Sequence, residues 1–291
     1  MPPADHAVDL RDASRGERLQ KVLAEAGVGS RRACEALIAR GAVEVNGEPV
    51  IALPAWVDPA QDDIRVNGKR VGAHREGRRG HVYVMLYKPR RTMCTMDDPG
   101  GRRTVAELVE HHSGERLFPV GRLDYDSMGL LLMTNDGDLT QHLTHPRYGV
   151  EKTYRVIVRG RLDEESVRKL GRGVYLSDRR EGRTLGGSRT AGVHIEIVRR
   201  EPERMHLDIT LHEGRNRQVR RMLADVGCAV KKLTRIRLGP LELRELRLGE
   251  WRDLTPHERR LLWNSVRRAR RTDEAPGTRP PRRAKRPNAA R

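Results

Sequence analysis

The sequence predicts an α+β protein with two domains, a small domain followed by a larger one built on a mixed, mainly antiparallel sheet. Three observations predict this architecture. The chain has 291 residues, which is enough for two hydrophobic cores. Apolar residues recur at helical spacing near the N-terminus, whereas after about residue 80 they gather in short β-branched or alternating runs. These runs do not alternate strictly with helices, which favours α+β over α/β.

The first domain is expected to span residues 17–73 and to contain two helices and two hairpins. Its first helix is predicted from Leu19, where apolar residues recur at i, i+3, i+4 and i+7. Ser30 can cap a second helix, which stops at Gly41. Strand-forming residues then run into two Asn-Gly pairs, the strongest short signal for a hairpin.

The second domain is expected to span residues 81–262. Its strands are predicted where apolar runs are bounded by turns, at residues 82–87, 130–134, 154–158, 193–197 and 205–211. Thr104 and Glu107 form a capping-box pattern, which predicts a helix over residues 105–111. Asp138 and Asp163 are each predicted to cap a further helix.

Three segments are expected to lie outside both cores. Residues 1–16 are polar and unpatterned, so we expect a flexible leader, and residues 74–80 have the charge and glycine content of a linker. Residues 263–291 are rich in Arg and Pro and predict a disordered tail. Such a tail either keeps the chain soluble or binds RNA loosely.

The composition points to a polyanionic partner. The formal net charge is +18 and the sequence pI is about 10.7, and Lys and Arg gain affinity by releasing counterions from phosphates. An anionic membrane is the rival partner, but no apolar run approaches the length of a spanning helix and the N-terminus lacks a signal-peptide pattern. We therefore expect a cytoplasmic protein.

Metal and disulfide chemistry have little support in the sequence. The three cysteines are widely spaced and form no C-x-x-C pair, so we expect buried reduced thiols. The adjacent His111 and His112 are interpreted as a solvated helix end rather than a metal site.

The stretch GRLDYDSMGLLLMTNDG, residues 121–137, places Asp124 in front of an apolar strand. Arg122 and Asp124 share a face if the segment is extended, because alternate side chains do. An exposed Arg–Asp turn is the simplest interpretation. The apolar strand that follows favours a functional one, since a buried strand would hold the turn rigidly.

Two further segments carry candidate residues. In HEGRNRQVRRML, residues 212–223, one helical stripe is apolar while Arg217, Arg220 and Arg221 share a neighbouring face. A solvated basic face is the simple interpretation, but three like charges on one face are better matched by phosphates or a buried carboxylate. Tyr154 begins a strand and is by default a packing residue, although aromatic side chains are only 3% of the chain.

In chain order, the segments GRLDYDSMGLLLMTNDG, EKTYRV (residues 151–156, with Tyr154) and LHEGRNRQVRRML together resemble the RsuA/RluB family of bacterial ribosomal RNA pseudouridine synthases. Residues 17–72 resemble the S4 RNA-binding module that precedes their catalytic domain, and the similarity extends over roughly residues 17–258. The segment QKVLAEAGVGSRRACEALIARGAVEVNG and the basic tail are closer to the branch that acts on 23S, large-subunit rRNA.

The resemblance implies roles for four residues. Asp124 matches the catalytic aspartate that acts on the target uridine while the base detaches, rotates and rejoins the ribose through C5. Attack on the ribose, attack on the base and proton abstraction all remain open. Arg220 matches the cationic partner that keeps this carboxylate ionised where water is excluded. Tyr154 matches the tyrosine that stacks on the extruded base, and Arg122 the residue that fills the gap left by it.

The resemblance also implies the partner. We expect ribosomal RNA, free or in an assembling large subunit, to bind a monomer that needs no metal, no small-molecule cofactor and no membrane. The residues expected to contact RNA, besides Arg122, are Arg31, Arg32, Arg217, Arg221 and Lys88. Leu233 or Leu238 is expected to supply an apolar wall. The alternatives are a 16S rRNA synthase and a non-catalytic S4-type assembly factor.

Overall fold

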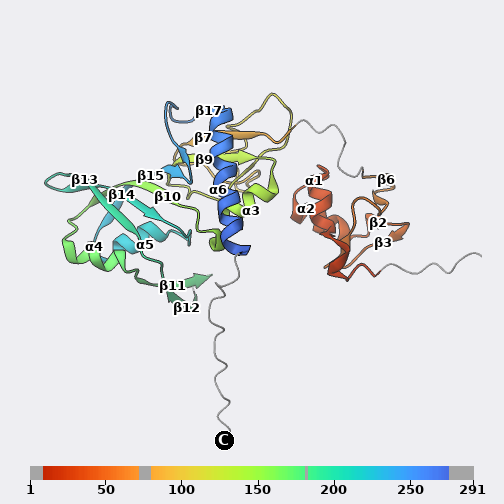
Figure 1. Cartoon of the computed structure of the whole chain (residues 1–291), viewed down its shortest axis with the longest axis horizontal. Helices are drawn as coiled ribbons and strands as arrows, with labels where there is room; N and C mark the ends of the chain where they lie inside the picture. Colours follow the sequence, from red (N-terminus) through yellow and green to blue (C-terminus); the bar gives the residue numbers. More distant parts are fainter. Residues whose placement is uncertain (1–8, 72–79, 181–182, 275–291) are drawn as a thin grey trace, which may run out of the picture. The chain divides into compact units, whose positions relative to one another are not determined.

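The computed structural model describes residues 9–71, 80–180 and 183–274, and the chain divides into two compact units, Met1–Gly80 and His81–Arg291 (Figure 1). We call these the N-terminal and C-terminal units. The predicted α+β class is confirmed, because both units combine helices with mainly antiparallel strands. Among the described residues, no helix has both the length and the apolar character needed to span a bilayer.

The N-terminal unit packs two helices on small antiparallel sheets. In chain order its elements are η1 Ala13–Arg15, β1 Glu17–Arg18, α1 Leu19–Glu25, α2 Arg31–Ala39, β2 Val43–Val45, β3 Glu48–Pro49, β4 Trp56–Val57, β5 Ile64–Val66 and β6 Lys69–Arg70. Both predicted helices and both predicted hairpins form. The Ser30 hydroxyl caps α2 by accepting from the Ala33 N–H, and Asn46 and Asn67 turn the hairpins with positive φ.

The expected flexible leader is wrong for its last residues. Residues 1–8 lie outside the described part of the chain, but η1 is ordered and Arg15 Nη2 lies 2.8 Å from a carboxylate oxygen of Asp62. The Trp56 N–H donates to the Leu10 carbonyl at 2.7 Å. Residues 10–15 therefore pack back onto the segment around β4, a long-range contact that a polar, unpatterned sequence does not reveal.

The C-terminal unit is built on a nine-stranded sheet in which the strand order is β13-β14-β10-β15-β9-β7-β17, with β16 and β8 pairing β15 and β9. These strands are β7 Tyr83–Lys88, β8 Phe118–Pro119, β9 Met128–Thr134, β10 Lys152–Arg159, β13 His194–Arg200, β14 Arg204–Leu211, β15 Ala229–Leu238, β16 Leu241–Glu242 and β17 Trp251–Asp253. A separate two-stranded ribbon joins β11 Tyr175–Arg180 to β12 Arg183–Arg189. All five strands predicted for this unit are present.

Two pairs of helices cover different parts of this sheet (Figure 1). The helices of the unit are α3 Gly137–Thr144, η2 Pro146–Tyr148, α4 Glu164–Gly171, α5 Gln218–Asp225 and α6 Pro256–Glu274. α4 and α5 pack on β10 and β14 around a core that includes Val156, Leu207 and Leu223. α3 and α6 pack on β7 and β9 around a second core that includes Met85 and Leu132.

Gly129 joins the two halves of the sheet. β9 and β15 are parallel and pair through only two positions, Met128 with Thr234 and Gly129 with Arg235. Gly129 has a φ of +121°, and a Cβ at this position would lie 2.3 Å from the Arg235 carbonyl oxygen. Only glycine permits this approach of the two backbones.

The helix expected over residues 105–111 does not form. The capping box itself is present, because the Thr104 N–H donates to the Glu107 carboxylate at 3.0 Å and the Glu107 N–H to the Thr104 hydroxyl at 3.4 Å. The following turn is closed by i→i−3 bonds, and Val105 and Val109 are buried against β7 and β9. Tertiary packing overrides the local helix signal.

Two other expectations need correction. The cap of α3 is Asp136 rather than Asp138, because its carboxylate accepts from the Leu139 N–H at 2.9 Å. The tail does not begin at residue 263, since α6 continues to Glu274 and Val266 is buried in the core that α3 and α6 share. Residues 72–79, which hold most of the expected linker, and residues 275–291 lie outside the described chain.

Candidate active site

Asp124 lies on a tight turn that leads directly into β9. The Ser127 N–H donates to the Asp124 carbonyl at 3.0 Å, and the Arg91 N–H donates to the Tyr125 carbonyl at 2.7 Å. Every residue of β9 that follows is buried. The turn is therefore held at both ends, as the apolar strand in the sequence predicts.

Lys88 supports this turn from inside the protein. Its side chain is 0% exposed, and Nζ donates to the carbonyls of Pro89, Asp124 and Ser127 at 2.9, 3.3 and 2.9 Å. Burial lowers the pKa of Lys88, while the nearby charges of Asp124 and Asp126 oppose this shift. The prediction that Lys88 contacts RNA is wrong, because a fully buried ammonium cannot reach a phosphate outside the protein.

Two arginines of the α5 region face the Asp124 carboxylate. Arg217 Nη1 and Arg220 Nε lie 3.7 and 3.9 Å from Asp124 Oδ2. These are ion-pair distances but are too long for hydrogen bonds. The Asp124 side chain is 27% exposed, so the expectation that water is excluded from it is wrong for the free protein. The carboxylate is reachable from solvent and lies in a positive field.

Arg220 has an unused hydrogen-bond donor. Its side chain is only 15% exposed, and its buried Nε has no hydrogen-bond partner within the described chain. Burial and the neighbouring Arg217 lower its pKa, whereas Asp124 raises it. A buried donor without an acceptor is costly, so this atom is well placed to bind an acceptor that enters the site.

Arg221 faces away from the carboxylate. Its guanidinium donates to the Ser177 carbonyl in β11 and thereby ties α5 to the β11–β12 ribbon. Arg217, by contrast, immediately precedes α5 in a left-handed conformation with φ of 50°, and its side chain is 45% exposed. Of the three arginines predicted to share a face, Arg217 and Arg220 thus lie at the Asp124 carboxylate, whereas Arg221 makes a structural contact.

Tyr154 lies two strands away from the Asp124 segment. It is paired with Arg235 of β15, which in turn pairs with Gly129 of β9. Its side chain is partly buried and packs against the core between the sheet and α5. The paired residues Tyr154, Arg235 and Gly129 thus lie side by side across β10, β15 and β9, and β9 is the strand that follows the Asp124 turn.

Two cations in this region, the buried Arg235 and the partly buried Lys152, were not found from the sequence. Arg235 is 2% exposed, and its Nε donates to the Leu130 carbonyl at 2.8 Å. Burial, together with the charge of Arg235, lowers the pKa of Lys152 to about 8. Both residues lie in strands, where a Lys or Arg usually faces solvent. Their positions in the sequence therefore did not indicate that they would be withdrawn from solvent.

The remaining candidates are spread over the two units. Arg31 and Arg32 are exposed in the first turn of α2, and Arg122 is exposed beside the Asp124 turn. Leu233 belongs to the core beneath α5, whereas Leu238 belongs to the core beneath α6. The N-terminal and C-terminal units thus each present arginines that are accessible to a polyanion.

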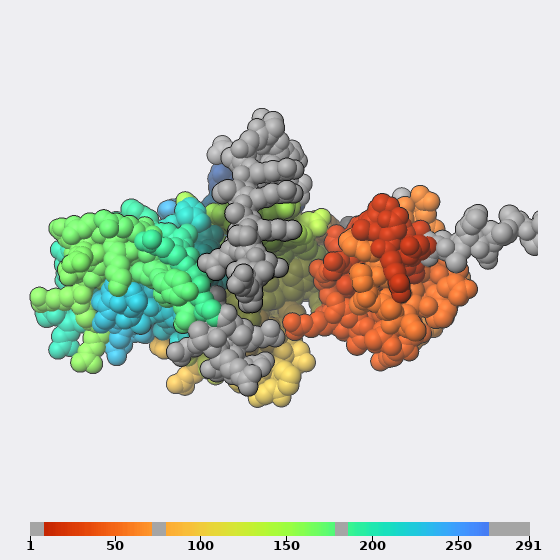
Figure 2. Space-filling model, turned by 90° about the horizontal axis from the view of Figure 1, so that it is seen from below, coloured from red at the N-terminus to blue at the C-terminus, as the bar shows by residue number. Residues whose placement is uncertain are grey.

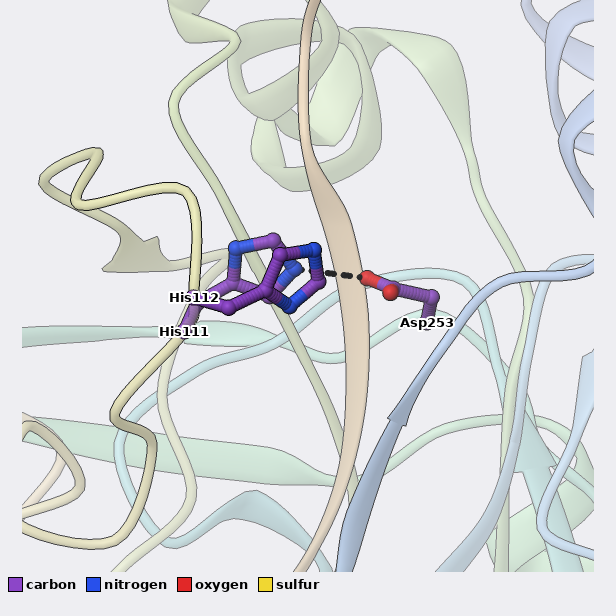
Figure 3. A group of neighbouring side chains, drawn as sticks. All are labelled: His111, His112 and Asp253. Atoms are coloured by element: carbon purple, nitrogen blue, oxygen red, sulfur yellow. Dashed lines mark hydrogen bonds and ion pairs between the residues drawn. The ribbon is translucent and has the colours of Figure 1, made fainter.

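A second cluster, His111, His112 and Asp253, has ligand atoms within 4.8 Å of one another (Figure 3). His111 Nδ1 accepts from the Ser113 N–H at 3.1 Å, so Nε2 carries the proton that bridges to Asp253 at 3.0 Å. The protonated Nε2 does not suit a metal. The cluster instead ties a loop to β17. The expectation of a solvated helix end is wrong for the helix, which does not form, and for the His111 side chain, which is 4% exposed, whereas His112 is exposed.

Comparisons with known proteins identify the families that the two units match. Residues 82–225 match the model of the RNA pseudouridylate synthase family, and residues 17–50 match the S4 domain. The chain is 44% identical over 242 residues to "Ribosomal large subunit pseudouridine synthase B" of Bacillus subtilis (strain 168), covering 83% of this chain and 93% of that protein.

Two further proteins extend the similarity. An "Uncharacterized RNA pseudouridine synthase" of Aquifex aeolicus (strain VF5) is 41% identical over 250 residues, which cover 86% of this chain and 94% of that one. The structure described as "Crystal structure of pseudouridylate synthase" superposes with a TM-score of 0.59 at 29% identity, covering 85% of this chain and 100% of that chain.

Proposed function

The chain belongs to the RNA pseudouridylate synthase family and carries an S4 domain, and from this premise we propose that it converts a specific uridine of large-subunit (23S) ribosomal RNA to pseudouridine. The observation that carries the proposal is the Asp124 carboxylate, which stands on a rigid turn within 4 Å of both Arg217 and Arg220. The large-subunit substrate follows from the B. subtilis relative and from a second "Ribosomal large subunit pseudouridine synthase B" of Yersinia pestis, 39% identical over 242 residues.

The reaction is an isomerisation, so its atoms balance within one nucleotide. The bond between N1 of the base and C1′ of the ribose breaks, and a bond between C5 and C1′ forms. The hydrogen at C5 leaves as a proton and N1 gains one. The chemistry therefore requires an ionised carboxylate, a means of rotating the base and a way to move protons.

The residues of the site match these requirements. Asp124 acts on the target nucleotide as the carboxylate, and the attraction of Arg217 and Arg220 for it strengthens as RNA displaces water from this partly exposed side chain. The Arg220 Nε–H, which has no hydrogen-bond acceptor among the described residues, donates to either the Asp124 carboxylate or a substrate oxygen. Tyr154 provides the aromatic face on which the extruded uracil stacks.

RNA recognition is divided between the two units. Exposed Arg31 and Arg32 at the start of α2 combine guanidinium groups with helix N–H groups, a suitable arrangement for phosphates. Arg122 fills the space that the extruded base leaves. Because the proposed substrate is ribosomal RNA, the activity belongs to ribosome biogenesis in the cytoplasm, and the enzyme works as a monomer.

The substitution Asp124→Asn tests the proposal. With rRNA labelled with tritium at C5 of uridine, we expect tritium release to fall on the order of 10³-fold or more, because the amide cannot act as a nucleophile or base. RNA affinity should stay near that of the wild type. The matched control is Asp126→Asn, since Asp126 shares the turn but lies 4.0 Å from Arg217 and is 50% exposed.

Mapping pseudouridines in the rRNA of a deletion strain identifies the target. One missing site in the large-subunit rRNA is expected, and a missing site in the small-subunit rRNA would reassign the substrate. Normal turnover by the Asp124→Asn protein would show that another residue carries the chemistry. A deletion strain with every site intact would leave a non-catalytic assembly factor as the better description.

A further inference from the structure

The β11–β12 ribbon holds an aromatic ring in a fixed position with one face open. The Tyr175 side chain lies on Gly187 of the opposite strand, so closely that a Cβ on Gly187 would come within 2.6 Å of the ring. The Tyr175 hydroxyl donates to the Gly187 carbonyl at 2.8 Å. Nevertheless Tyr175 is 66% exposed, the largest exposed fraction but one among the exposed large apolar residues described. The ribbon covers one face of the ring and leaves the other to solvent.

The surroundings of this ring are basic. Tyr175 lines an open depression together with four cations, Arg168, Lys169, Arg172 and Arg189, and two carboxylates, Glu165 and Asp225. One carboxylate is already neutralised, because Lys169 Nζ lies 2.9 Å from Asp225. In Figure 2 the surface of α4, in green, borders that of the end of α5, in cyan. The depression therefore presents surplus positive charge beside an aromatic face.

The ribbon is also fixed to the segment that forms the active site. Arg215 donates to the Ser188 and Arg189 carbonyls at 3.1 and 3.0 Å, and Arg221 donates to the Ser177 carbonyl. Arg217 and Arg220 of this same segment face Asp124. Residues 215–221 thus hold the ribbon through Arg215 and Arg221. The same residues face the Asp124 carboxylate through Arg217 and Arg220.

We propose that Tyr175, with Arg172 and Arg189, forms a second nucleotide subsite, which binds an unpaired nucleotide of the substrate RNA away from the target uridine. The base stacks on the open face of Tyr175, and the arginines contact the adjacent phosphates. Stacking on an aromatic ring next to cations is the usual way in which proteins hold unpaired RNA. A protein partner is disfavoured because the depression is charged and contains few apolar side chains. The inference rests on the proposed function, since it names part of that substrate.

Three variants of the full chain test the subsite. Affinity is measured by filter binding with an in-vitro transcript of large-subunit rRNA, and turnover by tritium release. Tyr175→Ala should weaken affinity about 5- to 100-fold, because one stacked base is lost. Tyr175→Phe keeps the ring and should bind within about threefold of the wild type, because only one hydrogen bond is lost. Gly187→Ala should bind as poorly as Tyr175→Ala, since the new Cβ displaces the ring.

The expected pattern is a change in affinity without a change in chemistry. At saturating RNA all three variants should turn over within about twofold of the wild type, because none of them alters an interaction made only in the transition state. Arg199→Gln serves as the control, since Arg199 is 69% exposed on β13 and lies outside the depression. Thermal unfolding of each variant confirms that the fold is retained.

A photo-crosslink provides an independent measurement. When the transcript carries 5-bromouridine, irradiation of its complex with the wild-type protein should link RNA to the tryptic peptide of residues 173–179, which contains Tyr175. Unchanged affinity of Tyr175→Ala together with no crosslink in this peptide overturns the subsite. If the wild type releases no tritium while Tyr175→Ala still loses affinity, the proposed function fails and the subsite stands.

Discussion

At the level of single residues, the two neighbouring arginines of α5 have different partners. Arg220 lies 3.9 Å from Asp124, whereas Arg221 is engaged with a backbone carbonyl of β11. We therefore expect Arg220→Met to lower the rate of pseudouridine formation about 10²-fold, the loss typical of one preorganised electrostatic contact. Arg221→Met removes a single hydrogen bond, worth about 0.5–1.5 kcal/mol, and should change the rate far less. Single-turnover assays of both variants check this, and equal losses would contradict the assignment.

Lys152 gives a prediction for stability against pH. Its pKa falls from the ordinary 10.5 to about 8 because the side chain is partly buried and lies near the charge of Arg235. Between these values the unfolded chain holds a proton that the folded protein has lost, so the free energy of unfolding rises as pH increases from about 8 to 10.5. Below pH 8 this contribution is absent.

The substitution Lys152→Met isolates that effect. We expect the variant to lose the rise between pH 8 and 10.5, and to gain stability at neutral pH because no charge has to be buried. Urea unfolding of both proteins across this range measures the difference. A wild-type curve that runs parallel to that of the variant would show that Lys152 titrates normally.

At the level of elements, an ion pair fixes the start of α6 to β17. The guanidinium of Arg252 donates to both carboxylate oxygens of Glu258 at 2.7 Å, and the Thr255 N–H donates to the same group at 2.8 Å. Hydrogen bonding to Arg252 is the main cause that lowers the pKa of Glu258 to about 2, against a desolvation effect in the opposite direction. The stability that this pair contributes is fully present above pH 4.5 and is lost as pH falls towards 2.

Glu258→Gln tests this tie. The variant should be less stable at neutral pH by on the order of 2 kcal/mol, a value reduced for partial solvent exposure of the pair. The difference between the two proteins should shrink on acidification and vanish near pH 2. Denaturant unfolding at several pH values supplies the measurement. A difference independent of pH would mean that the glutamate acts through packing rather than charge.

In the N-terminal unit, the elements that the sequence predicted are held by local interactions. The helices α1 and α2 follow from apolar spacing and the Ser30 cap, and the hairpins follow from their Asn-Gly turns. The capping box at Thr104 shows the limit of this reasoning, because its hydrogen bonds form while the helix does not. There, burial of Val105 and Val109 decides the path of the chain.

The site was predictable only in part for the same reason. Asp124 and Arg220 could be assigned from their motifs, and the structure places them together. Lys88 could not, because two of its three carbonyl partners lie 36 and 39 residues away in the sequence. Arg235 likewise finds its partner 105 residues away. A cation can be buried only where such distant carbonyls accept its hydrogen bonds, and the spacing of apolar residues in the sequence does not predict where these carbonyls lie.

At the level of the whole molecule, the net charge of +18 predicts strongly salt-dependent binding. Residues 275–291 contain six Lys and Arg residues and no acidic residue. Their removal should weaken rRNA binding at low salt, reduce the slope of log affinity against log salt, and leave the modified uridine unchanged. Filter binding at several salt concentrations and pseudouridine mapping measure these effects. A shifted modification site would instead show that these residues read sequence.

The truncation must leave α6 intact. A cut at residue 263 would remove Val266, which is buried with Leu262 in the core beneath α3, and should therefore destabilise the protein. A cut after Glu274 leaves that core complete. Comparing the thermal unfolding of the two truncated proteins separates loss of RNA contacts from loss of folding.

The buried ammonium of Lys88 binds main-chain oxygens alone, and this has a bearing on how the enzyme can diverge. Every amino acid offers the same carbonyl, so the loop keeps its shape whichever side chains it displays. Tyr125 and Asp126 are exposed on this loop, so new side chains there can change which RNA it contacts while the main chain that carries Asp124 stays in place.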